Sequence, residues 1–165
     1  TWFMHLREGE QILQIYRHHL TPFIFKILGA ILGTLPFFLV LFLFKESFST
    51  KVFIIAHVVI FIGFILVTTY ISLVYWLDKF VITNHRIVYV DWRFLTSRHE
   101  SEAFLHEIQE IQTVEKGFFS YFKIFDYGRI IVETASAHIN IDFPDAPDPE
   151  GIRRFIYHIR HPEHD

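Results

Sequence analysis

Histidine is abundant in this 165-residue sequence, which contains eleven of them, and histidine clusters can bind zinc. His158, His161 and His164 are three residues apart near the C-terminus. Pro162 ends the helix that would have to place all three on one face, so we expect no metal site there. His138 alternates with apolar neighbours, which is typical of a residue on the surface of a strand.

Carboxylates are also grouped, at Glu107, Glu110 and Glu115, but no base or metal ligand accompanies them at a spacing used in acid–base catalysis. No nucleotide-binding, serine-hydrolase or zinc-protease spacing is present. The absence of cysteine excludes disulfides, thiolate ligands and a thiol nucleophile. We therefore expect a protein that is not an enzyme, that uses no cofactor and that has no nucleic-acid partner.

Basic residues provide the first candidate binding site: Lys79, Arg86, Arg93 and Arg98 follow the second long apolar run of the chain. Cations next to a membrane can contact lipid phosphates, each worth about 1 kcal/mol. Residues 77–165 nevertheless contain ten Lys and Arg against fifteen Asp and Glu, a formal charge of −5. Solvated strand residues are therefore the favoured interpretation, and headgroup binding is the alternative.

An aromatic segment at residues 117–125 (GFFSYFKIF) provides the second candidate. Its Phe118, Phe119, Tyr121 and Phe122 exceed what a single strand buries. They are predicted to contact the membrane or a partner, with packing in the core as the equal alternative.

Two apolar runs must position these residues, and neither contains Asp, Glu, Lys or Arg: residues 27–44 and residues 52–76. As helices they would extend roughly 27 Å and 37 Å, against a hydrocarbon core of about 30 Å. They predict a two-helix membrane hairpin over residues 23–76, since neither has the polar stripe of a surface helix. The alternative is a buried hairpin in a soluble protein. The spacing of Gly29 and Gly33 predicts close approach of another helix, either the second helix through Gly63 or Ala56 or, as the alternative, a second copy of the chain.

His57 is the one acid–base group within these runs and is a candidate by position alone. An imidazole bonded to a carbonyl, Thr34 or water is the favoured interpretation. Basic residues flanking the runs outnumber those in the loop by six to two, so we expect both termini in the cytoplasm and a multi-pass protein of the cell membrane. Residues 1–22 do not resemble a signal peptide. Within them, residues 10–16 predict a strand, and Arg17, His18 and His19 are expected to be interfacial anchors.

Residues 77–165 predict a sheet-rich domain. Residues 79–92 form a hairpin around Asn84-His85, residues 97–105 an exposed strand, and residues 130–134 and 138–143 a second hairpin. Residues 108–115 fit either a helical turn or a strand. Residues 144–149 are expected to break the structure, after which Asp148 caps a helix that buries Ile152, Phe155, Ile156 and Ile159.

Motifs along most of the chain resemble the bacterial pleckstrin-homology (PH-like) membrane proteins, the YdbS-like or membrane-flanked domain family. They are Gly9-Glu10-Gln11-Ile12, residues 75–87 with Ile82-Thr83-Asn84-His85-Arg86, residues 105–111, and residues 125–134 with Tyr127-Gly128. The resemblance implies a PH-like barrel of two antiparallel sheets and a capping C-terminal helix, attached to two membrane helices. It implies no established activity.

The sequence thus predicts an α+β protein with an N-terminal cytoplasmic segment (1–22), a transmembrane hairpin (23–76) and an all-β PH-like domain with a C-terminal helix (77–165). We expect it to act as a binding or assembly module at the cytoplasmic face, with the lipid bilayer and a protein partner or second copy as partners. One alternative is sensing of a lipid headgroup or ligand. Another is a membrane enzyme or transporter component that uses His57.

Overall fold

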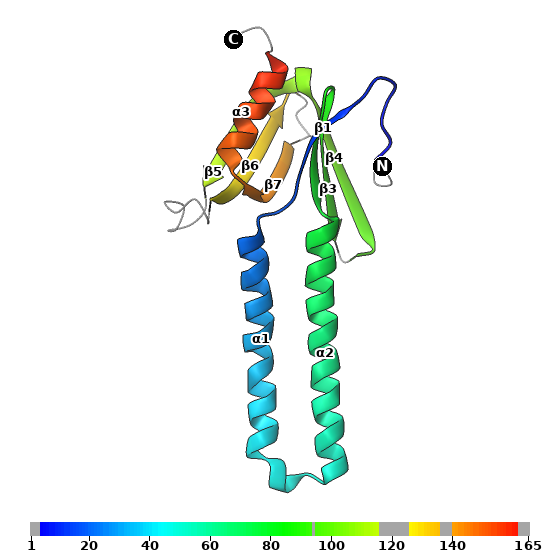
Figure 1. Cartoon of the computed structure of the whole chain (residues 1–165), viewed down its shortest axis with the longest axis vertical. Coiled ribbons are helices and arrows are strands. Elements are labelled where there is room, and N and C mark those ends of the chain that lie inside the picture. The colour runs from blue at the N-terminus through cyan, green and yellow to red at the C-terminus, as the bar shows by residue number, and fades with distance from the viewer. Residues whose placement is uncertain (1–3, 94, 116–125, 136–139, 162–165) are drawn as a thin grey trace. The chain divides into compact units, whose positions relative to one another are not determined.

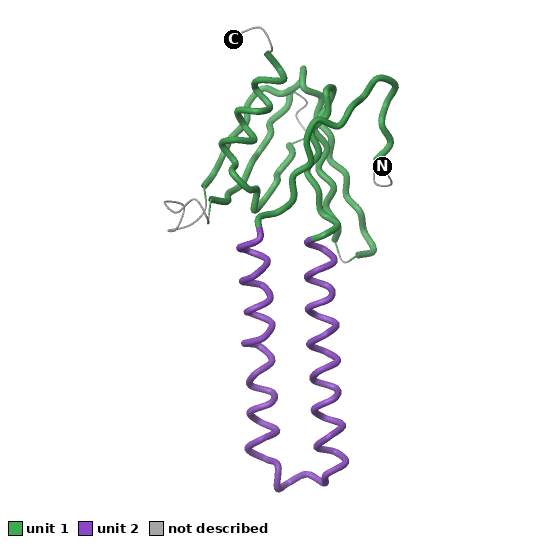
Figure 2. Tube along the Cα trace, viewed as in Figure 1, with its two compact units in different colours: residues 1–19, 76–165 green, residues 20–75 purple. Residues whose placement is uncertain are grey.

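Two compact units make up the chain in this computed structural model, which describes residues 4–93, 95–115, 126–135 and 140–161. Residues 1–19 and 76–165 form one unit, the β unit, and residues 20–75 form the other, the helical unit (Figure 2). The N-terminal segment is therefore not a region of its own, because its strand belongs to a sheet formed mainly by residues that follow the helices.

The helical unit contains α1 (Leu20–Leu43), the short 3₁₀ helix η1 (Lys45–Ser47) and α2 (Thr50–Leu77), whose last two residues belong to the β unit (Figure 1). Both helices are long and apolar enough to cross a membrane, with mean hydropathies of 2.2 and 2.7 over their most apolar windows and no buried residue in either window. Hydroxyl groups within them bond to the preceding turn, as Thr34 does to the carbonyl of Ala30 and Ser72 to that of Thr68.

The glycines of the helical unit lie in open space. A methyl group added at Gly29, Gly33 or Gly63 would meet no heavy atom within 4 Å. The predicted close approach of Gly29 and Gly33 to the second helix is therefore absent, and a groove lies between the helices near Gly63. Approach of a second copy through the same face stays a prediction.

The β unit consists of two antiparallel sheets and one helix. The first sheet has the order β1 (Ile12–Tyr16), β2 (Lys79–Thr83), β3 (Arg86–Arg93), β4 (Ser97–Phe104). The second has the order β5 (Ile108–Glu115), β6 (Tyr127–Thr134), β7 (Asn140–Pro147). The short 3₁₀ helix η2 (Leu105–Glu107) connects β4 of the first sheet to β5 of the second along the chain. The predicted strands are confirmed within the described residues, which exclude residues 136–139 of the second hairpin. Of the two interpretations of residues 108–115, the strand is the one observed.

The main core of the β unit lies between the two sheets. Fully buried Phe80 and Ile87 from the first sheet meet Ile130 and Phe143 from the second, and the Phe80 and Phe143 rings stack at 4.7 Å. A smaller apolar cluster covers the other face of the first sheet. It joins Val81, Val88 and Val90 to Met4, so the N-terminal segment covers a surface that β2 and β3 would otherwise expose.

β7 continues through Pro144 to Pro147, where the sequence predicted a break. An edge strand tolerates proline, since its outer N–H groups need no ladder partner. Pro144 and Asp145 together lie opposite a single residue of β6, and Asp145 has a φ of 54°, so the strand bulges there. The bulge turns the carbonyls of both residues toward the segment that leads into α1, as described below.

The helix α3 (Pro149–Arg160) lies beside β5 and β6 (Figure 1). As predicted, Asp148 caps it by accepting a hydrogen bond from Gly151 N at 3.0 Å, with Pro149 in the first turn. Ile152 and Ile156 are fully buried against the core.

Candidate functional site

Arg86 lies inside the β unit, where it joins the N-terminal segment to the first sheet. Its Nε donates to Glu10 Oε1 at 2.8 Å and one of its Nη atoms donates to the carbonyl of His5 at 2.8 Å, while the other contacts Glu102. The side chain is only 7% exposed and that of Glu10 is 0% exposed. Arg86, one of the four predicted lipid-binding cations, is thus bound to carboxylates of its own chain and does not face solvent.

Glu10 is held in its ionised form by this arrangement. Burial alone would raise its pKa, but hydrogen bonds from Arg86, from Arg7 N and from the Thr83 hydroxyl outweigh burial and lower the pKa from 4.5 to about 2. The same contacts raise the pKa of Arg86, chiefly through its hydrogen bond to Glu10. The pair is therefore a charged and fully hydrogen-bonded buried cluster.

Two of the sequence motifs that carry the resemblance meet at this cluster. Asn84, in the turn between β2 and β3, donates from Nδ2 to the carbonyl of Gly9 at 3.1 Å and accepts from Gln11 N at 2.8 Å. The Gly9-Glu10-Gln11 and Thr83-Asn84-His85-Arg86 motifs, more than 70 residues apart in sequence, are thus two sides of one contact. Their function is to attach β1 to the sheet.

His18 forms a second junction between distant segments of the β unit. Its Nδ1 lies 2.7 Å from the carbonyl of Pro144 and its Nε2 lies 3.2 Å from Asp78 Oδ2, while Asp78 Oδ1 accepts from Trp92 N at 2.8 Å. A carbonyl and a carboxylate both accept, so both contacts are satisfied as hydrogen bonds when both ring nitrogens carry protons. The His18 ring also packs 5.1 Å from that of Phe143.

His18 and His19 therefore make specific contacts within the β unit, rather than acting only as the interfacial anchors the sequence predicted. His19 N donates to the carbonyl of Asp145 at 2.7 Å, and its ring stacks on Tyr127 at 5.5 Å. Burial lowers the pKa of His19, an effect that Asp126 and Asp145 oppose. The bulge in β7 thus receives bonds from both residues.

Arg17 and Lys79 lie together at the end of the β1–β2 ladder. The last pair of the ladder is Tyr16 with Phe80, so the next position along it places Arg17 opposite Lys79. The Arg17 guanidinium lies 4.6 Å from the ring of Trp76, which is 62% exposed. Burial lowers the pKa of Lys79, and the neighbouring Arg17 cation lowers it further. Arg17, Trp76 and Lys79 are called the Arg17 site below.

Arg93 and Arg98, the remaining predicted cations, each have a carboxylate partner on their own strand. Arg93 bonds Asp91 at 3.1 Å and Arg98 bonds Glu100 at 2.9 Å. The structure therefore does not bring the four predicted cations to one point. It brings together Lys79 and Arg17, and the sequence had indicated Arg17 only as an interfacial anchor.

The aromatic candidates Phe118, Phe119, Tyr121 and Phe122 lie outside the described residues, as do His138 and His164. Among the residues that the structure describes, no group of three or more His, Asp and Glu side chains is arranged to hold a metal ion.

His57 in α2 bonds to its own helix. Its Nδ1 lies 2.9 Å from the carbonyl of Phe53, and its ring packs between those of Phe53 and Phe38, at 4.3 Å and 5.5 Å. This confirms the expectation of an imidazole bonded to a carbonyl. The structure shows no acid or base within the described part of the helical unit that bonds to it.

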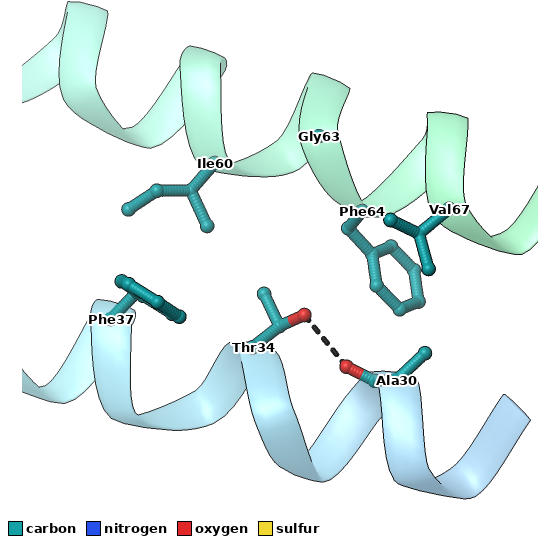
Figure 3. A pocket seen from close by; sticks show the side chains of 7 residues that line it. All are labelled: Ala30, Thr34, Phe37, Ile60, Gly63, Phe64 and Val67. Carbon is teal, nitrogen blue, oxygen red and sulfur yellow. Dashed lines mark hydrogen bonds between the residues drawn. The ribbon is translucent and has the colours of Figure 1, made fainter. Parts of the chain in front are cut away.

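A groove of about 370 Å³ lies between α1 and α2 in the helical unit (Figure 3). It is lined by Ala30, Thr34, Phe37, Ile60, Gly63, Phe64 and Val67. Thr34 supplies the polar side chain of this lining, and its hydroxyl is already bonded to the carbonyl of Ala30 at 2.7 Å. The groove lacks the convergent polar groups that orient a substrate, and its chemistry suits apolar contacts.

The chain belongs to the Bacterial PH domain family, whose model matches residues 25–160. This confirms the predicted family, and the two antiparallel sheets with a closing C-terminal helix form the PH-like fold that the resemblance implied. The YdbS-like subtype stays a prediction.

Solved structures similar to the chain include two from Shewanella species. A DUF1696 family protein with a pleckstrin-homology domain from Shewanella loihica PV-4 is 16% identical, with a TM-score of 0.39, and the match covers 50% of this chain and 70% of that one. A pleckstrin homology domain from Shewanella amazonensis SB2B is 18% identical, with a TM-score of 0.38, and the match covers 48% of this chain and 63% of that one. No curated protein matches the sequence.

Proposed function

We propose that this protein is a non-enzymatic binding or assembly module, anchored in the cell membrane by α1 and α2, with its PH-like β unit and both termini in the cytoplasm. The pairing of β1 with β2 carries the proposal. β1 precedes α1 and β2 follows α2, so both strands must lie on one side of any membrane. A bilayer crossed by α1 must therefore be crossed again by α2.

The surface of the helices supports the same proposal. Large apolar side chains such as Leu32, Leu43 and Leu66 are 64–66% exposed in the helical unit. Lipid tails or the helices of another protein solvate such side chains better than water does. Six basic residues flank the helices on the side of the β unit, whereas the short loop between the helices contains only two, Lys45 and Lys51. Because basic residues are more frequent on the cytoplasmic side of a membrane, this difference favours the cytoplasm for the β unit.

A role as a membrane enzyme or transporter component gains no support from His57, whose ring nitrogen bonds to its own helix. Replacement of His57 by Leu is expected to leave the protein in the membrane and its partners unchanged.

Cysteine labelling tests the orientation, and the cysteine-free chain allows single-site variants. Ser47→Cys lies in the loop between the helices and Ser97→Cys lies in β4, and both residues are exposed. A membrane-impermeant maleimide applied to intact cells is expected to label Ser47→Cys, and to label Ser97→Cys only after permeabilisation. Labelling of Ser97→Cys in intact cells would overturn the orientation, and recovery of the chain in the soluble fraction would overturn the anchor.

Photo-crosslinking tests the assembly role. A benzophenone side chain at Phe37, which lines the groove, is expected to capture a second copy or another membrane protein in native membranes. The matched control carries the probe at Glu46 in the loop, whose side chain is 90% exposed. Equal capture at both positions, or capture of lipid alone at Phe37, would contradict an assembly through the helices.

A further inference from the structure

The strand register places the cations of the Arg17 site on one face of the first sheet. Phe80 and Tyr16 pack against the main core. Because side chains alternate along a strand, Lys79 and Arg17 point to the opposite face. Val81 and Val90 belong to the smaller apolar cluster on that face, and Val90 pairs with Lys79. Two cations thus lie side by side at the edge of an apolar surface.

The Arg17 guanidinium is oriented but not neutralised. It lies over the indole of Trp76 at 4.6 Å, and among the described residues it has no ion pair or hydrogen bond. A guanidinium that stacks on an aromatic ring keeps its planar N–H edges available for two parallel hydrogen bonds to an oxyanion. The geometry is therefore suited to a group with several acceptor oxygens, such as a phosphate.

Two acidic residues next to the site along the chain and the sheet, Asp78 and Asp91, each have a partner of their own. Asp78, next to Lys79 in sequence, is 6% exposed in its side chain and is bonded to His18 and to Trp92 N. Asp91 on the neighbouring strand β3 bonds Arg93. The charge of Arg17 acts on Lys79 and lowers its pKa, and an anion that contacts both side chains would reduce this repulsion.

The position of the Arg17 site in the chain favours a phospholipid headgroup over a free phosphate as the source of the anion. Arg17 lies three residues before the start of α1, and Lys79 lies two residues after the end of α2. Where these helices cross a membrane, both cations lie at the depth of the headgroups, and an exposed Trp such as Trp76 is typical of that depth. A free phosphate from the cytoplasm would gain no benefit from this location.

We propose that Arg17, Lys79 and Trp76 form a binding site for the phosphate of one anionic phospholipid, in which Arg17 supplies a bidentate contact and Lys79 a second charge. The site rests on the proposed membrane anchor, but it differs from the predicted set of Lys79, Arg86, Arg93 and Arg98. Of those four cations it retains only Lys79.

Native mass spectrometry of the full chain in detergent tests the site. The protein is titrated with phosphatidylglycerol or with phosphatidylcholine of the same acyl chains, and lipid-bound species are counted. We expect one phosphatidylglycerol to bind preferentially, and the double variant Arg17→Gln/Lys79→Gln to lose about 30-fold in affinity, equivalent to about 1 kcal/mol for each cation.

The matched control is Arg93→Gln/Arg98→Gln, which removes the same charge from the same sheet and is expected to bind as the wild type does. Arg17→Lys keeps the charge but removes the planar guanidinium group, so its affinity for phosphatidylglycerol is expected to fall several-fold. An equal loss in both double variants, or no preference of the wild type for phosphatidylglycerol, would overturn the site. Displacement of the lipid by millimolar inorganic phosphate would show a site for free phosphate and would overturn the lipid assignment.

Carbonate extraction of the same variants separates this inference from the proposed anchor. Both double variants are expected to stay in the membrane pellet, since neither changes α1 and the substitutions lie outside α2. Loss of the wild type from the pellet would refute the anchor itself. Retention of the wild type together with absence of lipid preference would refute the site alone.

Discussion

Polar side chains are held in different ways in the two units of this protein. In the β unit, Glu10, Arg86, His18 and Asp78 are buried or half-buried and bond to partners more than ten residues away in sequence. In the helical unit, hydroxyl groups such as that of Ser72 return to the preceding turn of the same helix. The tertiary structure of the β unit is therefore defined by contacts within the chain, whereas that of the helical unit depends on what surrounds it.

Removal of the buried Arg86 cation is expected to lower the stability of the β unit more than any other change considered. Arg86→Met leaves Glu10 buried without its counterion, so the free energy of unfolding of the β unit should fall by roughly 3–5 kcal/mol. Arg98→Met, which removes a more exposed ion pair, should change it by at most about 1 kcal/mol. Thermal unfolding of the full chain in detergent, followed by circular dichroism, measures both.

The double variant Glu10→Gln/Arg86→Met removes both charges and should recover part of the loss. Equal effects of Arg86→Met and Arg98→Met would show that the Glu10–Arg86 pair does not stabilise the unit.

Acid is the next largest perturbation, and it should act on the β unit alone. The pKa of Glu10 is lowered from 4.5 to about 2 in the folded chain. Its contribution is therefore present above pH 4.5 and is lost as the pH falls from 4.5 toward 2, by about 2–3 kcal/mol. Unfolding followed at pH 5 and at pH 2.5 measures this loss, which Glu10→Gln should reduce. An unchanged pH dependence in that variant would exclude Glu10 as the group responsible.

Replacement of His18 by Phe keeps a ring against Phe143 but removes both hydrogen bonds. The carbonyl of Pro144 and the carboxylate of Asp78 then lose their partner, and we expect a loss of about 2 kcal/mol. His106→Phe is the matched control, because the side chain of His106 is 77% exposed, and it should change stability by less than about 0.5 kcal/mol. A loss in the control as large as that in His18→Phe would contradict the junction.

Substitution of glycine by alanine is expected to change the free energy of unfolding least. The same substitution can be made in both units, so it allows the most direct comparison between them. A methyl group at Gly128 would overlap the carbonyl oxygen of Val114 and lie 2.8 Å from Pro149 Cγ, so Gly128→Ala should cost about 1–2 kcal/mol. Gly63→Ala meets open space and should cost nothing, since Ala favours a helix. Melting curves of both variants decide the comparison, and a cost at Gly63 would indicate that another molecule packs there.

The sequence predicted the local elements well because their signals are local. Alternation in residues 79–92, the Asp148-Pro149 helix start and the two apolar runs each depend on neighbouring residues. The bulge in β7 was missed, because Pro144 and Pro147 resemble a break unless the strand is known to lie at an edge. The N-terminal strand was predicted, but its partner was not.

The site was predicted less well because it depends on pairing across long separations. Lys79 and Arg86 are equally basic in sequence, but only the structure shows that Arg86 is bound to Glu10. Arg17 becomes notable through its register with Lys79, which requires knowing that β1 and β2 are neighbours. The motifs containing Glu10 and Arg86 were the available signal, since an acidic and a basic side chain would have to bond to each other once buried.

The β1–β2 ladder also imposes an order on synthesis. Sixty-two residues separate Tyr16, the end of β1, from Lys79, the start of β2. At about 5–20 residues per second, the ribosome delivers β2 roughly 3–12 s after β1. During that time the first strand has no partner strand to join, because β2 follows both helices in the chain. The strand made first is thus completed only by residues made after α2, so the first sheet of the β unit cannot close until both long helices have been synthesised.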